Sequence, residues 1–192
     1  MDNGHGLDNE GKETVMDKPQ SDLAFKFMAL GYRFRDLFRP RRDILKEVGI
    51  QPGFHVLDYG CGPGSYIAAA AELVGESGKV YAADIHPLAI QRVRKIASKK
   101  GFHNIETVQT DCDTGLAAGS VDVALLYDIF HALDKPEQVL KELHRVLKPE
   151  GVLSFSDHHM KATEILTKIS GPGLFVFSTT NNKTYSFSKR IT

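Results

Sequence analysis

Short apolar runs alternate with amphipathic stretches along the middle of the chain, from residue 54 to residue 156. The run at 121–127 is rich in Val, Ala and Leu, as in a strand covered on both faces. The stretch at 136–147 repeats apolar residues every three or four positions, as on one face of a helix. We predict strands at 54–59, 79–83, 105–109, 121–127 and 152–156, and helices at 65–74, 87–100 and 136–147. Strands that alternate with helices indicate a Rossmann-like, doubly wound α/β sheet with right-handed crossovers.

The pattern changes after residue 156. A helix is expected at about 160–169, before the breaker Gly171-Pro172-Gly173. Two β-rich runs follow, 174–178 and 184–188, and only a short turn-forming segment joins them. Such runs should pair as an antiparallel hairpin. The complete prediction is a mixed seven-stranded sheet, mostly parallel, that ends in an antiparallel hairpin strand.

The first 48 residues have a third pattern. Residues 1–20 hold few large apolar side chains and cannot bury enough surface to offset the cost of ordering, so we predict a flexible tail. From residue 21 the pattern is helical, with Leu23, Phe27 and Leu30 on one face, and a second short helix is expected from 41 to 48. We therefore predict a single domain over 21–192, whose N-terminal helices (21–48) cover the ligand site.

Composition narrows the class of protein. The chain of 192 residues is long enough for one domain with a real core, and 42% hydrophobic with 25% charged residues is ordinary for a globular protein. Its formal charge of zero gives no overall attraction to nucleic acid or to an anionic membrane. Two cysteines without C-x-x-C spacing favour neither a disulfide framework nor zinc. No secretory leader or membrane-length apolar run is evident, which predicts a cytoplasmic protein.

A glycine-rich segment follows the first predicted strand, in Asp58-Tyr59-Gly60-Cys61-Gly62-Pro63-Gly64. Alternate glycines let the backbone turn sharply and approach a ligand closely, because no Cβ obstructs it. In an open α/β sheet, ligands bind outside the carboxyl ends of the strands. The segment therefore predicts a nucleotide-binding loop.

An acid, Asp84, ends the second predicted strand. A carboxylate there can accept hydrogen bonds from both hydroxyls of a ribose, and Ile85 would then lie against the adenine. The alternative is that Asp84 caps the helix that begins at Pro87. The two uses are compatible.

Several segments together resemble class I S-adenosylmethionine-dependent methyltransferases, most closely the small-molecule enzymes of the ubiquinone/menaquinone-biosynthesis type. The hydrophobic strand and G-x-G-x-G loop of 56–64 resemble the first motif of that family, and Val121–Tyr127 resembles its fourth. The segment 143–153 is similar to the family's L-x-R-V-L-K-P-G-G stretch, with Glu150 where a glycine is frequent. The acid at 84, the pair at 111–112 and the closing hairpin complete the resemblance.

The resemblance implies S-adenosylmethionine as cofactor and S-adenosylhomocysteine as product. Asp58 would hold the methionyl amino group, Asp84 the ribose and Asp111 the adenine amino group, while Tyr127 would border the methyl group. For Asp111 the alternative is a turn residue, and for Tyr127 a core aromatic. The full set of implied cofactor-binding residues is Asp58, Tyr59, Gly60, Cys61, Gly62, Gly64, Asp84, Ile85, Asp111, Cys112 and Tyr127.

Polar residues that follow the fourth and fifth strands are the candidates on the acceptor side. Asp128 and His131 are the predicted catalytic residues, and His158 and His159 are further candidates for a base. The alternatives for His131 are that it lines the pocket without acting as a base or that it begins a helix. Asp157 beside the two histidines suggests a metal, but adjacent residues point apart, so no metal is predicted.

The expected function is methyl transfer to a small-molecule acceptor by in-line displacement, catalysed mainly by positioning. We expect a monomer or homodimer that binds neither membrane nor nucleic acid. One alternative is a non-catalytic module that binds S-adenosylmethionine. The other is a nicotinamide-dependent Rossmann oxidoreductase, against which stand the G-x-G-x-G spacing and the antiparallel hairpin.

Overall fold

The computed structural model describes residues 19, 21–38, 41–181 and 184–191, with the side chains of 28 and 32–38 excepted. Its strands are β1 His55–Tyr59, β2 Lys79–Asp84, β3 Ile105–Gln109, β4 Val121–Tyr127, β5 Leu147–Ser156, β6 Phe175–Asn181 and β7 Thr184–Lys189. Its helices are α1 Asp22–Phe38, α2 Arg41–Glu47, α3 Ile67–Val74, α4 Pro87–Lys100, the 3₁₀ turn η1 Phe130–Ala132, α5 Pro136–Val146 and α6 Ala162–Ser170. Most of the predicted tail lies outside the described residues.

The strands form one seven-stranded sheet in the order β3-β2-β1-β4-β5-β7-β6. The first five strands are parallel, and β7 is antiparallel to both of its neighbours, β5 and β6. The predicted mixed sheet with a closing antiparallel hairpin is confirmed. Strand order reverses at β1 and β4, which lie side by side and lead in opposite directions across the sheet, so a ligand site is expected outside their carboxyl ends.

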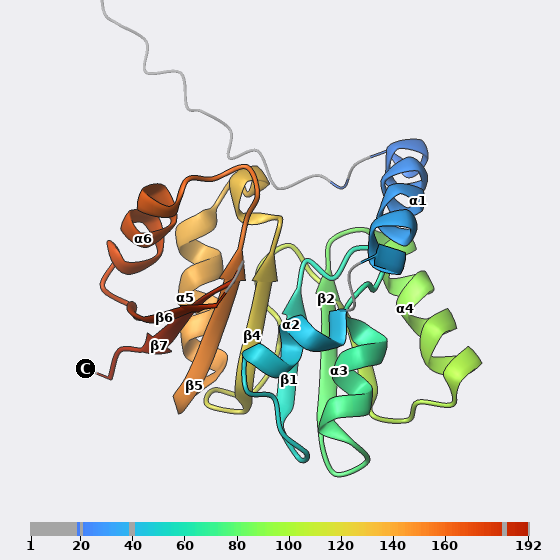
Figure 1. Ribbon diagram of the computed structural model, residues 1–192, viewed down its shortest axis with the longest axis horizontal. Helices are drawn as coiled ribbons and strands as arrows, with labels where there is room; N and C mark the ends of the chain where they lie inside the picture. Colours follow the sequence, from blue (N-terminus) through green and yellow to red (C-terminus); the bar gives the residue numbers. More distant parts are fainter. Residues whose placement is uncertain (1–18, 20, 39–40, 182–183, 192) are drawn as a thin grey trace, which may run out of the picture.

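Helices cover both faces of the sheet (Figure 1). Val56 and Val123 belong to the core cluster that also holds buried side chains of α3 and α4. Their neighbours along the strands, Leu57 and Ala124, face the other way and pack with α5 and α6. Because successive strand residues point to opposite faces, β1 and β4 at the centre of the sheet are buried on both sides.

Helix α1 lies beyond the carboxyl ends of the strands, on the side of α4 (Figure 1). Its buried side chains are Phe25 and Ala29, whereas Leu23, Phe27 and Leu30 are 65%, 68% and 51% exposed. The apolar face predicted from the spacing therefore points to solvent. Phe25 instead stacks on His86 at a centroid distance of 4.4 Å, a contact that helical periodicity alone does not reveal.

Element ends differ from the predictions by a few residues, and β5 by more. This strand begins at Leu147 rather than at 152, because Leu147 pairs with Val121 across a register shift in β4. Strands β3 and β4 have the predicted bounds. Among the described helices, none is both long and apolar enough to cross a membrane.

Candidate active site

A cavity of about 390 Å³ opens at the carboxyl ends of the central strands. The predicted site residues that line it are Asp58, Tyr59, Gly60, Cys61, Gly62, Asp84, Ile85, Asp111, Tyr127, Asp128 and His131. Gly64 and Cys112 are not among its lining residues. The cavity also touches residues that the sequence did not single out, including Phe25, Tyr66 and Ile129. Residues spread over more than a hundred positions thus meet in one space.

The glycine loop is shaped by three left-handed backbone conformations. Gly60, Gly62 and Gly64 have φ of 76°, 50° and 84°. A Cβ on Gly60 would lie 2.6 Å from Ile129, and one on Gly64 would lie 2.8 Å from Ile96, so both glycines allow close packing inside the protein. A Cβ on Gly62 would meet no atom within 4 Å. Gly62 is therefore the glycine whose bare side faces open space.

Asp84 ties the glycine loop to the second strand. Its two carboxylate oxygens accept hydrogen bonds from the backbone N–H groups of Gly62 and His86, each at 2.8 Å. The helix that follows is capped by His86, whose Nδ1 accepts from Leu88 N at 3.1 Å. Burial raises the pKa of Asp84, and the two backbone hydrogen bonds partly offset that rise. Asp84 thus braces the loop and faces the cavity, while the cap role belongs to another residue.

Asp58 is the buried carboxylate at the centre of the site. It is 3% exposed, and its Oδ2 has no hydrogen-bond partner, which is rare for a buried carboxylate oxygen. Burial, together with the neighbouring Asp84 carboxylate, raises the pKa of Asp58 from 3.8 to about 7. Such a group is poised to accept a cation or a hydrogen-bond donor from the cavity.

Two tyrosines, Tyr59 and Tyr127, line the cavity and are fixed by hydrogen bonds. Tyr127 is almost fully buried, its hydroxyl lies 2.6 Å from Ser154 Oγ, and its ring packs on Tyr66. Burial raises the pKa of Tyr127 well above its ordinary range, so this hydroxyl remains protonated. The Tyr59 hydroxyl donates to the Asp111 carbonyl at 3.1 Å and fixes the loop after β3. Cys112 N–H already donates to Thr110 Oγ1 at 3.1 Å.

The acceptor-side candidates form two carboxylate–imidazole pairs after β4 and β5. His131 Nδ1 lies 2.9 and 3.0 Å from the two carboxylate oxygens of Asp157. His158 Nδ1 lies 2.9 Å from Asp128 Oδ1. The ring of His159 packs between those of His131 and His158, at centroid distances of 4.1 and 3.9 Å. The three histidines therefore form one cluster in the wall of the cavity.

Backbone geometry explains why these loops lie together. Among the described non-glycine residues, Asp128 alone has a positive φ, 54°. Its N–H donates to the Ser156 carbonyl at 2.8 Å, which joins the two loops where adjacent parallel strands end. In the sequence, Asp157 stands out only because it precedes the histidine pair that suggests a metal. Its position next to β4 in the sheet was the signal that could have linked it to His131.

The hydrogen bonds of the Asp128 and Asp157 carboxylates indicate whether this cluster could bind a metal ion. Ligand atoms of Asp128, Asp157 and His158 lie within 4.8 Å of one another. Both oxygens of Asp157, however, accept from N–H groups of His131 and His159, and Asp128 Oδ1 accepts from His158. These oxygens are already occupied by hydrogen bonds, so the geometry favours orientation of the imidazoles over ligation of an ion.

Fold and site together define a class. A sheet of this order, a glycine loop after β1 and an acid at the end of β2 are the features of a class I methyltransferase domain. The glycine loop also lacks the G-x-G-x-x-G spacing of dinucleotide-binding proteins.

Comparison with known proteins agrees. A family model described as a methyltransferase domain matches residues 50–182. Demethylmenaquinone methyltransferase of Geobacillus stearothermophilus is 29% identical over 120 residues, which are 62% of this chain and 51% of that protein. Aklanonic acid methyltransferase of Streptomyces sp. (strain C5) is 33% identical over 128 residues, 62% of this chain and 54% of that protein. The chain spans about half the length of these curated relatives.

A solved structure extends the match. The SAM-dependent methyltransferase from Aquifex aeolicus superposes with a TM-score of 0.69 at 25% identity, covering 78% of this chain and 88% of that one. The chain belongs to the methyltransferase-domain family, in its S-adenosylmethionine-dependent class I branch.

Proposed function

We propose that this chain transfers the methyl group of S-adenosylmethionine to a small-molecule acceptor. One observation carries the proposal: the carboxylate of Asp58, buried against the glycine loop, has an oxygen without a donor. The methionyl ammonium of the cofactor is a donor of suitable charge for that oxygen. Asp58 lines a cavity that is large enough for a small ligand.

The same geometry supports the other proposed cofactor contacts. Each carboxylate oxygen of Asp84 accepts one backbone N–H and keeps capacity to accept from a ribose hydroxyl. The open side of Gly62 allows the cofactor to approach the backbone. Ile85 would contact the adenine ring and Asp111 its amino group. Because the N–H of Cys112 is engaged with Thr110, we confine the polar adenine contact to Asp111.

Positioning supplies most of the proposed catalysis. When bound, the sulfonium provides an activated methyl group, so the protein's task is to align acceptor, methyl and sulfur and to exclude water. Holding reactants in line contributes up to about 7–11 kcal/mol to lowering a barrier. Tyr127 and Asp128 border the space in which the methyl group would lie. The relatives' names, which specify demethylmenaquinone and aklanonic acid, support a small organic acceptor.

Helix α1 is proposed to cover the bound cofactor. Phe25 and Pro19 line the cavity, and Phe25 stacks on His86 directly after the ribose-binding strand. His86 Nε2 also lies 3.8 Å from Asp22 Oδ1 on the same helix. Removing residues 1–40 should therefore weaken cofactor affinity and leave the sheet folded.

The proposal is tested by calorimetric titration with S-adenosylhomocysteine and with NAD, followed by incubation with labelled S-adenosylmethionine and fractionated metabolites. We expect S-adenosylhomocysteine to bind, NAD not to bind, and label to reach a small molecule. Binding of NAD alone would overturn the proposal in favour of an oxidoreductase. Binding of S-adenosylhomocysteine without transfer to any fraction would favour a non-catalytic binding module.

A further inference from the structure

The imidazole of His131 is held more firmly than an ordinary pocket-lining histidine. Its Nδ1 lies 2.9 and 3.0 Å from the two Asp157 oxygens, and its own backbone N–H donates to the same carboxylate at 3.1 Å. A third donor, the backbone N–H of His159, binds Asp157 Oδ1 at 3.0 Å. The Asp157 side chain is fully buried, whereas that of His131 is 32% exposed. The carboxylate is thus an internal anchor, and the imidazole is the part that reaches the cavity.

This arrangement fixes the tautomer of His131. Burial alone would raise the pKa of Asp157, but the hydrogen bonds from His131 and His159 outweigh burial and hold the pKa below its usual range. The carboxylate is therefore ionised near neutral pH and can only accept hydrogen bonds. Nδ1 of His131 must carry the proton, which leaves Nε2 of the neutral ring with a free lone pair.

The neighbouring groups favour one proton acceptor rather than several. The ring of His159 packs on those of His131 and His158, at centroid distances of 4.1 and 3.9 Å, so the three imidazoles form one cluster. His158 is the more exposed, at 63% of its side chain, and its partner Asp128 is itself partly exposed. The other titratable groups that line the same cavity are Asp58, Tyr59, Cys61, Tyr66, Asp84, His86, Asp111 and Tyr127. Among the three histidines, only His131 has a fully buried carboxylate behind it.

We propose that His131, positioned by Asp157, is the proton acceptor of the methyl transfer, and that the methyl acceptor is a nucleophile that carries a proton on its reacting oxygen or carbon. This inference rests on the proposed function and narrows it. Pyridines, tertiary amines and thioethers, which react through a lone pair and lose no proton, are then not substrates. Asp157 acts through His131 and is a positioning residue.

The step balances in atoms and charge. Nε2 of His131 takes the proton from the acceptor's X–H bond. The electron pair left on X forms the new bond to the methyl carbon. The carbon–sulfur bond breaks with its pair on sulfur, which neutralises the sulfonium. The proton then passes from His131 to solvent.

Kinetics of the full-length chain test the proposal with two acceptor panels, phenols on one side and pyridines with tertiary amines on the other. We expect transfer to phenols only. His131→Gln should lower kcat by about 100-fold or more, the usual contribution of a general base, and leave S-adenosylhomocysteine affinity within twofold. Asp157→Asn should lower kcat about 10-fold or more and shift the acid limb of the kcat–pH profile, which a purely structural role would not do.

Two matched variants control for folding. His144→Gln alters a histidine on α5 whose Nε2 meets the Arg190 carbonyl, away from the cavity. Asp122→Asn alters a partly buried carboxylate at the opposite end of β4, which accepts from His55 N–H at 2.7 Å. Both should keep kcat within twofold. Transfer to pyridines or amines alone, a His131→Gln kcat within threefold of wild type, or an unshifted Asp157→Asn profile would overturn the proposal.

A measurement without any acceptor covers the remaining outcomes. In the ¹⁵N spectrum of the S-adenosylhomocysteine complex, the neutral His131 ring, assigned by its loss in His131→Gln, should carry its proton on Nδ1. A proton on Nε2 would overturn the proposal even if no acceptor reacts. Activity abolished by chelators and restored by Mg²⁺ or Zn²⁺ would also overturn it, in favour of a metal at the same cluster. Failure of S-adenosylhomocysteine to bind would instead overturn the proposed function.

Discussion

Asp58 and Asp157 are both buried carboxylates, but Asp58 lines the ligand cavity whereas Asp157 lies behind His131. Asp58 Oδ2 has no donor, and the pKa of Asp58 rises to about 7. Asp157 receives N–H groups from two histidines, and its pKa falls below the usual range. Burial is common to the two groups, so the opposite signs come from the hydrogen bonds that lower the pKa of Asp157 and from the Asp84 charge that adds to the rise at Asp58. An unsatisfied carboxylate indicates a ligand that brings the donor, whereas a satisfied one indicates a group that already holds its partner.

The largest expected effect is on the pH dependence of stability. Because the pKa of Asp58 is about 7 in the folded ligand-free protein and 3.8 as an ordinary carboxyl, its stabilising contribution is complete below pH 4 and is lost as pH rises through 7. At pH 8 the ionised group costs up to ~4 kcal/mol. Urea unfolding of wild type and Asp58→Asn should therefore diverge from pH 4 to pH 8, with the variant the more stable at pH 8. Parallel curves would contradict an unsatisfied Asp58.

The second effect concerns the cofactor. Asp58→Asn removes the charge that would pair with the methionyl ammonium, and S-adenosylhomocysteine affinity should fall about 100-fold, since a lost buried charge pair costs ~3 kcal/mol. Isothermal titration measures this. Wild-type binding should also release a proton near pH 7, seen as a dependence of the heat on buffer ionisation enthalpy. Equal affinity of the variant and wild type would remove Asp58 from the site.

Asp157→Asn tests the opposite side of the comparison. An amide presents donors toward N–H groups that need acceptors, so the variant should lose about 1–3 kcal/mol of stability at pH 7. The pKa of Asp157 is lowered on folding, so its contribution is present above the ordinary pKa of an aspartate and is lost as pH falls through the folded value. The stability gap between variant and wild type should shrink below pH 4 in urea titrations. A gap that widens toward acid pH would show the reverse sign.

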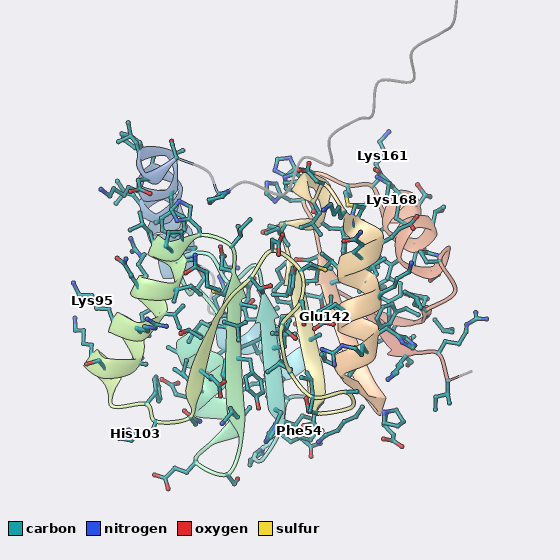
Figure 2. All side chains as sticks on the ribbon, turned by 180° about the vertical axis from the view of Figure 1, so that it is seen from behind. Phe54, Lys95, His103, Glu142, Lys161 and Lys168 are labelled. Atoms are coloured by element: carbon teal, nitrogen blue, oxygen red, sulfur yellow. The ribbon has the colours of Figure 1, made fainter. Side chains whose placement is uncertain are left out.

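The smallest effect is expected at Glu142, a satisfied carboxylate outside the site. Figure 2 shows it on α5, where its Oε1 accepts from Thr114 N–H at 2.9 Å and from the Thr114 hydroxyl at 2.5 Å, and Arg145 pairs with it at 2.7 Å. Burial alone would raise the pKa of Glu142, but these hydrogen bonds lower it. Glu142→Gln keeps an acceptor for Thr114 and should cost ~1 kcal/mol by thermal unfolding. If Glu142→Gln changed the affinity for S-adenosylhomocysteine, the effects of substituting Asp58 and Asp157 would not be specific to the site.

The sequence predicted those features that depend on short-range patterns. Strands β3 and β4 have the predicted bounds, and the hairpin pairs as expected, because alternation and turn residues are local signals. The glycine loop and Asp84 are predicted from the rule that strand ends of a parallel sheet meet at one edge, and Asp111 is implied by the family resemblance; Gly60, Gly62, Asp84 and Asp111 line the cavity. The prediction of which face of α1 is buried was wrong. Phe25 and Phe27 are equally apolar, and only the distant partner His86 distinguishes them.

The pair of His131 and Asp157 was also beyond the sequence. The two residues are far apart along the chain and meet because β5 lies next to β4 and the Asp128 N–H joins their loops. Strand order therefore had to be known first. The unsatisfied Oδ2 of Asp58 likewise depends on the position of every nearby donor.

The loops after β4 and β5 are separate in sequence from the loops after β1, β2 and β3, and protein engineers could use this separation. The loops after β1, β2 and β3 carry most of the residues proposed to hold the methyl donor. The loops after β4 and β5 contribute a second set of lining residues: Ile129, His131, Ala132, Leu133, His158 and His159. The two sets of residues line the same cavity but lie in different loops. A combinatorial library that varies only the second set, with His131 retained, would search for new acceptors while the proposed cofactor-binding residues stay unchanged. Variants that still bind S-adenosylhomocysteine could then be selected first.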